Sequence, residues 1–412
     1  MLLKDIPNNT DHPVMLPFEG KDVPHLIIEV NQKCNITCRA CYKSKFDYTK
    51  PLEEIKSEVD FAVSRRNLHV ITLAGGEPSL HPKLPEVIKY IAQKGVMVQM
   101  LSNGFALTDN RLEQYKEAGL FKVFLHIDSQ QQRPDVERGA SENELNALRT
   151  KISNKILAHG IKCGLEVTLY QDSLKDFPAF VDYYLKSSSY QWLLVTCCCD
   201  SSKIAEKFGM DGPHKLEVNR ESLIHQQVTN KEVLYSLYGS YKMLPYAYIA
   251  SSDNSEDMRW LIYFSFSINK RNGKAKILHV KPSFRRLAIL GNMLHQKKFG
   301  TYSFDVVWTE FQTLSVCFLY GLVSLNIITF FQTMGFLLNL LLPASKITYK
   351  LTCFQQGPNL TSSGGIEYCK ACPDITVRNG KLIPVCMVDI LSEMPKNYKA
   401  SLSNIHGRQT AT

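Results

Sequence analysis

A repeated strand-then-helix pattern over residues 25–200 is the feature that most constrains how this 412-residue chain folds. Six segments rich in Val, Ile and Leu are predicted strands: HLIIEV, HVITLAGGEP, VMVQMLSNG, KVFLHID, KCGLEVTLY and WLLVTCC. The segments between them are long enough for helices, as at residues 52–67, 83–95 and 109–119. Strands joined by helical crossovers form a parallel sheet. We therefore expect an α/β fold, a partial (β/α)6-type barrel with its chemistry at the carboxyl ends of the strands.

Conspicuous motifs follow four of these strands. Cys34, Cys38 and Cys41 come directly after the first strand with the spacing C-x3-C-x2-C; GGE follows the second, SNG the third, and HIDS ends the fourth. A closed zinc site needs four ligands, and no further cysteine or histidine lies close to the triplet. An iron–sulfur cube bound by three thiolates leaves one iron open for another molecule. The triplet therefore favours a cluster with one reactive iron.

The cysteine triplet, together with AGGEP at residues 74–78, resembles the radical S-adenosylmethionine (radical SAM) superfamily over residues 25–200. The resemblance implies that a [4Fe–4S] cluster on the three cysteines binds S-adenosylmethionine (SAM) and cleaves it reductively. The 5′-deoxyadenosyl radical that results removes a hydrogen atom from a substrate. A flavodoxin- or ferredoxin-like electron donor is implied as well. One departure is Ala40, where the family often has an aromatic residue; here Tyr42 follows the third cysteine instead.

Polar residues and glycines around the strand ends are predicted to hold SAM. They are Tyr42, Gly75, Gly76, Glu77, Ser102, Asn103, Asp128 and Glu166. The two glycines would let the backbone approach the ligand, and the Glu77 carboxylate could receive the SAM ammonium group, although backbone carbonyls could do so alone. Ser102 and Asn103 suit the ribose or the carboxylate, and Asp128 suits the ribose or the substrate. The alternatives are a simple turn at Asn103, a cap at Asp128, and a Glu166 that faces a helix.

Four further cysteines near the end of the chain form the pattern C-x15-C-x2-C-x13-C: Cys353, Cys369, Cys372 and Cys386. Four thiolates with one CxxC pair can hold a second [4Fe–4S] cluster or a structural zinc ion. Extensions of radical SAM enzymes often carry auxiliary clusters, although their usual spacings differ from this one. Unliganded thiols are the third option. Residues 197–199, three consecutive cysteines, are expected to be buried, with the option that one thiol lines the active site.

Residues 311–345 carry no charge and exceed the length needed to cross a bilayer. Read as one helix, the stretch has a polar stripe formed by Ser315, Asn326, Thr329, Gln332, Thr333 and Asn339. Three interpretations stay open: a buried helical pair or lid that bends at Gly321 or Gly335, a membrane-surface or lipid-binding helix, and a membrane span. The preceding residues 259–304 contain ten Lys or Arg and no Asp or Glu, which indicates an anionic neighbour or a solvated face.

The expected organisation has six parts: a lead-in (1–24), a radical SAM core barrel (25–205), a basic linker with a hairpin around Asn272-Gly273 (206–310), an apolar helical segment (311–345), a cysteine-rich region (346–395) and a loose tail (396–412). The amino terminus lacks an apolar signal sequence. We therefore expect the thiols to lie in a reducing cytoplasm, with membrane association as an option.

Two enzymatic functions compete. The apolar stretch beside the basic one favours hydrogen abstraction from a hydrophobic or lipid-like substrate. The alternative is a maturase that modifies peptide or protein side chains, which the short segment before the first strand makes less favourable, because 24 residues are too few for a peptide-docking domain. A non-catalytic iron–sulfur or zinc protein would have no use for the GGEP motif. The basic hairpin lacks interleaved aromatic residues specific for nucleic acid.

Overall fold

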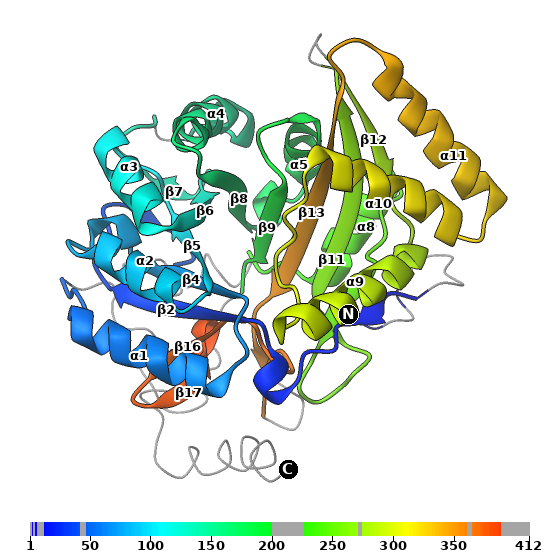
Figure 1. Ribbon diagram of the computed structural model, residues 1–412. Helices are drawn as coiled ribbons and strands as arrows, with labels where there is room; N and C mark the ends of the chain where they lie inside the picture. Colours follow the sequence, from blue (N-terminus) through cyan, green and yellow to red (C-terminus); the bar gives the residue numbers. More distant parts are fainter. Residues whose placement is uncertain are drawn as a thin grey trace.

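All six predicted strands form one parallel sheet in their order along the chain (Figure 1). They are β2 (His25–Asn31), β4 (Val70–Gly75), β5 (Met97–Ser102), β6 (Leu120–His126), β8 (Lys162–Leu169) and β9 (Trp192–Cys197). The computed structural model describes residues 2, 5, 12–41, 47–137, 139–199, 226–270, 274–360 and 365–388. Two-residue strands, β3 (Thr37–Cys38) and β7 (Gln131–Gln132), pair apart from this sheet. The expected partial α/β barrel is confirmed.

Helices cover the outer face of the sheet. They are α1 (Leu52–Arg65), α2 (Leu84–Gln93), α3 (Asp109–Ala118), α4 (Glu142–Ala158), α5 (Phe177–Lys186) and α8 (Asn230–Tyr241). Short 3-10 helices lie in the loops: η2 (Gly20–Asp22), η3 (Pro78–Leu80), η4 (Gln171–Ser173) and η5 (Pro282–Phe284). Local signals set the helix limits, since a capping box of Ser141 and Glu144 begins α4, and Gly119 ends α3 with a left-handed backbone.

The C-terminal extension continues the same sheet. Its strands, with one from the amino terminus, are β1 (Val14–Met15), β10 (Ala247–Ala250), β11 (Met258–Asn269), β12 (Ala275–His279) and β13 (Lys346–Gln356). β13 pairs in parallel with β9, and β11 pairs antiparallel with β13, β10 and β12. The pairing of β11 with β12 confirms the predicted hairpin, while the turn proposed at Asn272-Gly273 lies outside the described residues.

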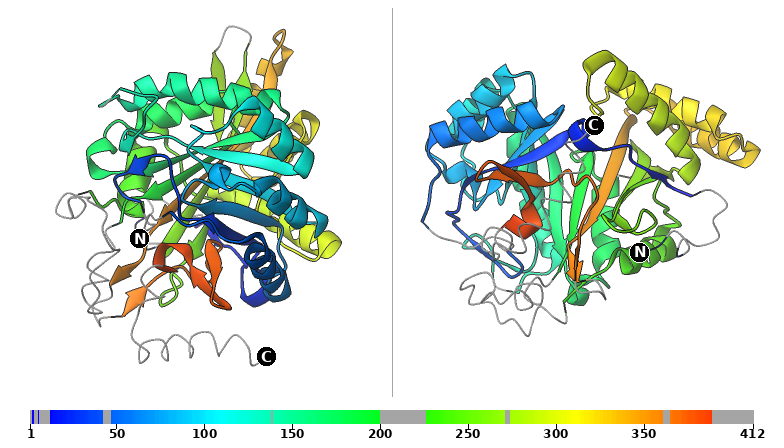
Figure 2. Two further views of the ribbon diagram at one scale, coloured as in Figure 1. Left: turned by 90° about the vertical axis from the view of Figure 1, so that its left-hand side faces the viewer. Right: turned by 90° about the horizontal axis from the view of Figure 1, so that it is seen from below.

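Three helices and a 3-10 turn lie over the inner face of β11 and β13 (Figure 2): α9 (Arg285–Phe299), α10 (Glu310–Val323), α11 (Ile327–Leu337) and η6 (Leu338–Leu341). The uncharged stretch is therefore a helical pair, as one of the interpretations predicted, but the pair is not buried, since Phe311, Ile327 and Phe331 are 76%, 72% and 65% exposed. The proposed bend was wrong: the chain turns at Leu325, whose φ is +52°, whereas Gly321 and Gly335 lie inside helices. In the part of the chain that the structure describes, no helix has both the length and the apolar character to cross a membrane.

The cysteine-rich segment folds back onto the first strand of the barrel. Its elements are β14 (Asn359–Leu360), β15 (Ile366–Glu367), β16 (Ile375–Arg378), β17 (Lys381–Pro384) and the 3-10 helix η7 (Val385–Met387). A tight turn with the sequence RNGK joins β16 to β17, with positive φ at Asn379 and Gly380. Arg378 is paired with Glu29 of β2 at 2.8 Å. This ion pair holds the segment beside the barrel.

Candidate active site

Three thiols lie on the loop that leaves β2. Cys34, Cys38 and Cys41 are each partly exposed, and Cys38 belongs to β3, which pairs with the β7 segment that follows β6. The hydroxyl of Tyr170, at the end of β8, accepts a hydrogen bond from the Ala40 amide at 3.2 Å. The loop is therefore held over the carboxyl ends of the strands, where the sequence placed it.

Gly75 and Gly76 bring the end of β4 against the backbone that leads to the first cysteine. A Cβ on Gly76 would lie 2.1 Å from the Lys33 carbonyl oxygen. One on Gly75, whose φ is +126°, would lie 2.2 Å from the Asn31 carbonyl oxygen. The Glu77 amide also donates to the Lys33 carbonyl at 2.8 Å. Both glycines are thus required because two backbone segments of the protein lie in close contact here. That the glycines also let the backbone approach SAM stays a prediction.

The Glu77 carboxylate is buried and bonded to protein groups through both oxygens. Oε1 accepts hydrogen bonds from the Ser79 amide at 3.1 Å, the Ser79 hydroxyl at 2.5 Å and the Ser102 hydroxyl at 2.8 Å. Oε2 accepts one from the Asn103 amide at 2.8 Å. Glu77 therefore ties the carboxyl ends of β4 and β5 together. These four bonds favour the alternative in which backbone carbonyls receive the SAM ammonium group.

Asn103 joins the SNG turn to the cysteine loop. Its Nδ2 lies 3.9 Å from Cys34 Sγ and donates to Asn35 Oδ1 at 2.8 Å. Its Oδ1 accepts a hydrogen bond from the Phe105 amide at 3.0 Å, and the next residue, Gly104, has a φ of +76°. The structure therefore bears out the turn at Asn103 and adds a contact with the first cysteine, while the predicted role of Asn103 in holding SAM stays a prediction.

A group of two carboxylates and an imidazole lies at the ends of β6 and β8. Asp128 Oδ2 is hydrogen-bonded to His126 Nε2 at 2.9 Å. Burial disfavours a charged ring at His126, but Glu166 and Asp128 outweigh burial and raise its pKa to about 9. Burial raises the pKa of Glu166, and among the described residues its Oε2 has no hydrogen-bond partner. This buried oxygen is available to a donor group of a bound ligand.

Sequence reasoning missed three residues of this region: His126, Arg133 and Tyr170. His126 could have been found, because it lies two residues before Asp128 and so shares its face of the strand. Arg133 is buried and donates to the carbonyl of the SNG asparagine at 2.8 Å, but it lies in a loop without a motif. Tyr170 offered no local signal for its bond to the cysteine loop. Tyr42, which was predicted to help hold SAM, lies outside the described residues.

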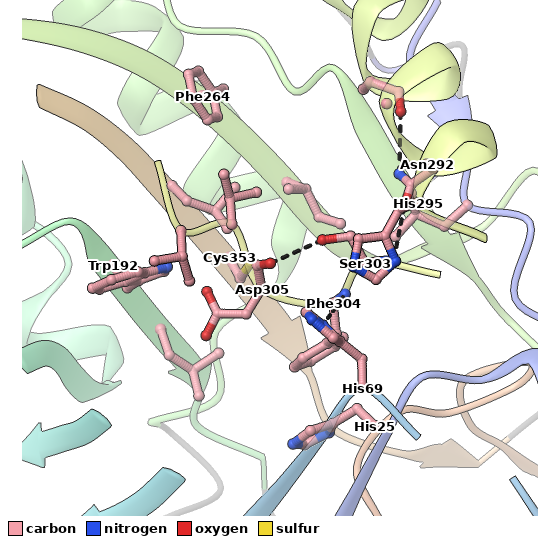
Figure 3. Close-up of a pocket in the computed structure, with 18 of the residues that line it drawn as sticks. His25, His69, Trp192, Phe264, Asn292, His295, Ser303, Phe304, Asp305 and Cys353 are labelled. Carbon is pink, nitrogen blue, oxygen red and sulfur yellow. Dashed lines mark hydrogen bonds between the residues drawn. The ribbon is translucent and has the colours of Figure 1, made fainter. Parts of the chain in front are cut away.

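An apolar cavity of about 610 Å³ fills the inside of the partial barrel. One part of its wall consists of inward-facing strand residues, which alternate with residues that pack against the outer helices, and the other part comes from α9, residues 303–308 and α10. Figure 3 shows Trp192, Phe264 and Cys353 on the side of the sheet, opposite residues 303–305 and His295 of α9. The cavity thus lies between the sheet and the segment around α9.

The cavity and the motifs at the strand ends share one inner surface. Leu101 in the cavity wall directly precedes Ser102, and Phe124 in the wall lies two residues before His126. Two residues of a strand span roughly 7 Å, so the cavity begins about one side-chain length from this histidine. Ile27 and Leu101 of the wall also pack with Ala74, the residue before the two glycines.

Two pairs of ionisable side chains interrupt the apolar wall: Lys122 with Asp305, and His25 with Asp374, whose Nδ1 and Oδ1 lie 3.1 Å apart. Lys122 Nζ is paired with Asp305, and it lies 4.4 Å and 4.3 Å from the ring centroids of Phe124 and Trp192. Burial lowers the pKa of Lys122, while the Asp305 carboxylate and the two rings stabilise its charged form. Because the Lys122 ammonium already has an anionic partner, the cavity suits an uncharged ligand better than a charged one.

The late cysteines occupy two places. Cys369 and Cys372 are hydrogen-bonded to each other, which lowers the pKa of Cys369 and raises that of Cys372. Cys386 lies within electrostatic range of Cys369 and also of Cys199. Cys353 lines the cavity, where burial raises its pKa to about 12. The structure therefore brings three of the four predicted ligands near one another and adds Cys199, which the sequence pattern did not include.

The residues present fit an iron–sulfur cluster by the chemistry of their donors. Thiolates are the usual ligands of such clusters, and the triplet offers three on one exposed loop. Across the described ranges, however, no three His, Cys, Asp or Glu side chains converge closely enough to hold a metal ion. The ligand roles of the early and the late cysteines therefore stay predictions.

The sequence of the chain matches one protein-family model. A model described as the radical SAM superfamily matches residues 28–183. The chain is 29% identical over 172 residues to the Fe-coproporphyrin III synthase of Methanosarcina barkeri (strain Fusaro / DSM 804), a match covering 41% of this chain and 42% of that protein. It is 30% identical over 113 residues to the GTP 3′,8-cyclase of Chlorobaculum tepidum, covering 27% and 34%.

Among solved structures, the chain is similar to Streptococcus suis SuiB bound to the precursor peptide SuiA. The TM-score is 0.35 and the identity 14%, over 44% of this chain and 40% of that one. The matched part therefore spans less than half the length of each of these three proteins.

Proposed function

Residues 28–183 belong to the radical SAM superfamily, and from this premise we propose that the chain is an enzyme that abstracts a hydrogen atom from a hydrophobic, lipid-like substrate. The family implies a [4Fe–4S] cluster and SAM as cofactors. When bound, they supply the one-electron chemistry that breaks the C5′–S bond of SAM and removes the hydrogen atom. The observation that carries the substrate class is the apolar cavity inside the barrel.

The residues of the chain would position these cofactors rather than perform the bond cleavage. Cys34, Cys38 and Cys41 would hold the cluster through their thiolates. The contacts of Gly76 with the preceding backbone fix where the cysteine loop starts, and Asn103 contacts its first thiol. The free oxygen of Glu166 would accept a hydrogen bond from a hydroxyl or amino group of the ligand. Together these contacts would orient SAM toward the inside of the barrel.

The cavity supports an apolar substrate by its size and by its charge. A volume of about 610 Å³ lies within the range of small-molecule sites, which are mostly apolar. The wall carries aromatic and aliphatic side chains such as Phe124, Trp192 and Phe264, and its buried lysine, Lys122, is paired with Asp305. An aliphatic chain would therefore be taken from water into an apolar site without leaving a charge unpaired.

Three further features belong to the proposal. The chemistry needs a one-electron donor, which we propose to be flavodoxin- or ferredoxin-like. The late cysteines are proposed to hold a second [4Fe–4S] cluster, with zinc as the alternative; their ligand set includes Cys369, Cys372 and Cys386. We also propose that the protein acts in the cytoplasm at the membrane surface, where a lipid substrate would be found.

The test measures whether lipids stimulate SAM cleavage. The protein is reconstituted anaerobically with iron and sulfide, and 5′-deoxyadenosine is quantified with oleic acid, geranylgeraniol or phosphatidylglycerol dispersed in detergent. We expect at least one of these to raise the product above the uncoupled background. No rise with any lipid would refute the proposed substrate class, and a rise with peptides alone would favour the maturase alternative.

A matched pair of variants ties the effect to the cavity. Gly291 on α9 lines the cavity, whereas Gly239 on α8 does not, and an added Cβ meets nothing within 4 Å at either position. Gly291→Phe should reduce the lipid stimulation and keep the uncoupled SAM cleavage. Gly239→Phe should change neither. Equal lipid stimulation in the two variants would show that the lipid does not use this cavity.

A further inference from the structure

The helices α9, α10 and α11 expose an apolar surface, which we call the apolar helix face. The exposed fraction of the residue is 61% for Met293, 76% for Phe311, 72% for Ile327, 61% for Ile328 and 65% for Phe331. The three helices lie next to one another on one side of the molecule (Figure 1). Monomeric soluble proteins rarely expose apolar patches of this kind without a binding function.

α10 and α11 expose large apolar side chains and bury three threonines beside apolar residues such as Tyr320 and Phe336. Thr313, Thr329 and Thr333 are buried against the protein, while Phe318 and Leu322 are about half exposed. Two of the buried hydroxyls bond backbone carbonyls one turn earlier, since Thr313 Oγ1 donates to the Thr309 carbonyl at 2.9 Å and Thr333 Oγ1 to the Thr329 carbonyl at 2.8 Å. A helix in water normally turns its apolar side chains inward. The outer surroundings of this pair are therefore expected to be apolar.

The cavity opens on the same surface. Leu290 and Leu294 of α9, Val307 before α10, and Leu319 of α10 line the cavity and are between 44% and 59% exposed. None of the residues of α9 is buried, because one of its sides faces the cavity and the other faces the outside. An apolar chain that entered between α9 and α10 would reach the cavity along apolar side chains.

Basic residues border the apolar helix face. Lys281 donates to the hydroxyl of Thr329 on α11 at 2.9 Å, and Arg286 donates to the Val323 carbonyl at the end of α10 at 3.0 Å. Lys297 and Lys298 are exposed near the end of α9. Residues 259–304 contain no Asp or Glu. An apolar surface with a basic border matches the interface of an anionic bilayer.

We infer that the apolar helix face docks on an anionic membrane, and that the opening between α9 and α10 takes a lipid chain from the bilayer into the cavity. The use of this lipid as substrate rests on the proposed function, whereas the docking does not. Charge favours the membrane over a second copy of this chain, because face-to-face copies would bring two basic borders together.

Vesicle sedimentation tests the docking. The full chain is mixed with phosphatidylcholine vesicles that contain or lack phosphatidylglycerol. We expect co-sedimentation with the anionic vesicles, less with the neutral ones, and a decrease at high salt. Changing Ile327, Ile328 and Phe331 together to Glu should weaken the association at least about tenfold, since each inserted apolar side chain contributes on the order of tenfold. Val63→Glu on α1, also an exposed apolar position, should bind like wild type.

Three results would overturn the inference: no co-sedimentation with anionic vesicles, unchanged co-sedimentation of the α11 variant, or a wild-type dimer that this variant dissociates. Detergent-dispersed lipids separate the docking from the proposed function, because the α11 variant should retain lipid-stimulated SAM cleavage in detergent. If the wild type binds vesicles but no lipid stimulates cleavage, the docking stands and the proposed substrate class is wrong.

Discussion

Replacing Gly76 with alanine tests how the GGE motif supports the cysteine loop. The added methyl group would lie 2.1 Å from the Lys33 carbonyl oxygen, 2.6 Å from its carbonyl carbon and 2.8 Å from the Gln32 carbonyl oxygen. All three are backbone atoms, so no side chain can rotate away. Ordinary contact begins near 3.4 Å, and the segment that leads to Cys34 would therefore have to retreat by more than 1 Å.

The cost follows from this displacement. Overpacking a well-packed site costs typically about 1–3 kcal/mol. The shift would also weaken the hydrogen bond from the Glu77 amide to the Lys33 carbonyl, which contributes roughly 1 kcal/mol. We expect Gly76→Ala to lower the free energy of unfolding by about 2–4 kcal/mol. Because Cys34 would move relative to the other two cysteines, the iron bound after reconstitution should fall as well.

Two assays and one control complete the test. Urea denaturation of the cluster-free protein measures the loss of stability, and iron and sulfide content after anaerobic reconstitution measures the effect on the loop. Gly239→Ala is the control, because a Cβ there meets nothing within 4 Å and alanine is favoured over glycine in a helix by up to about 1 kcal/mol. If cluster-free Gly76→Ala unfolds like wild type and only SAM affinity falls, the glycine serves the ligand and our reasoning is wrong.

Three further outcomes are expected. The raised pKa of His126 stabilises the fold below pH 6.5 by up to about 3 kcal/mol, and this is lost as pH rises through 9; unfolding of His126→Gln should lack that pH dependence. Asp305→Asn leaves the Lys122 ammonium without an anionic partner, so urea denaturation should show a loss of about 3–5 kcal/mol, whereas an unchanged midpoint would mean that the lysine is neutral. Cys369→Ala should remove one cluster's iron, while Cys353→Ala keeps it if that thiol only lines the cavity.

The parallel strands could be predicted because each is a short apolar run, and four of the six are followed by a conspicuous motif. Helical crossovers then determine their order, as β2 to β9 show. The place of β13 could not be predicted, since its residues alternate like those of many strands. Nothing in KITYKLTCFQQ indicates that its parallel partner is β9, far earlier in the chain. Pairing over such a distance depends on packing of the whole sheet.

Spacing along the chain showed which residues share an edge of the sheet, but not which way their side chains turn. Glu77 was expected to face SAM, and it bonds Ser79, Ser102 and Asn103 instead. The predicted polar stripe of residues 311–345 depended on the assumption that these residues form one continuous helix. Thr329 and Thr333, one turn apart, lie on the buried side of α11, whereas Gln332 is exposed and Asn326 caps the start of that helix.

The insertion of β13 between β9 and β11 has a consequence for how the protein is made. β9 ends at residue 197 and β13 begins at residue 346, so a ribosome adds about 150 residues before β9 acquires its second neighbour. At typical synthesis rates this takes roughly 8–30 s. Throughout that interval one edge of β9 has no partner strand, and this edge can pair with strands of other chains. We therefore expect soluble yield to depend on translation speed and chaperone supply more than on the stability of the finished fold.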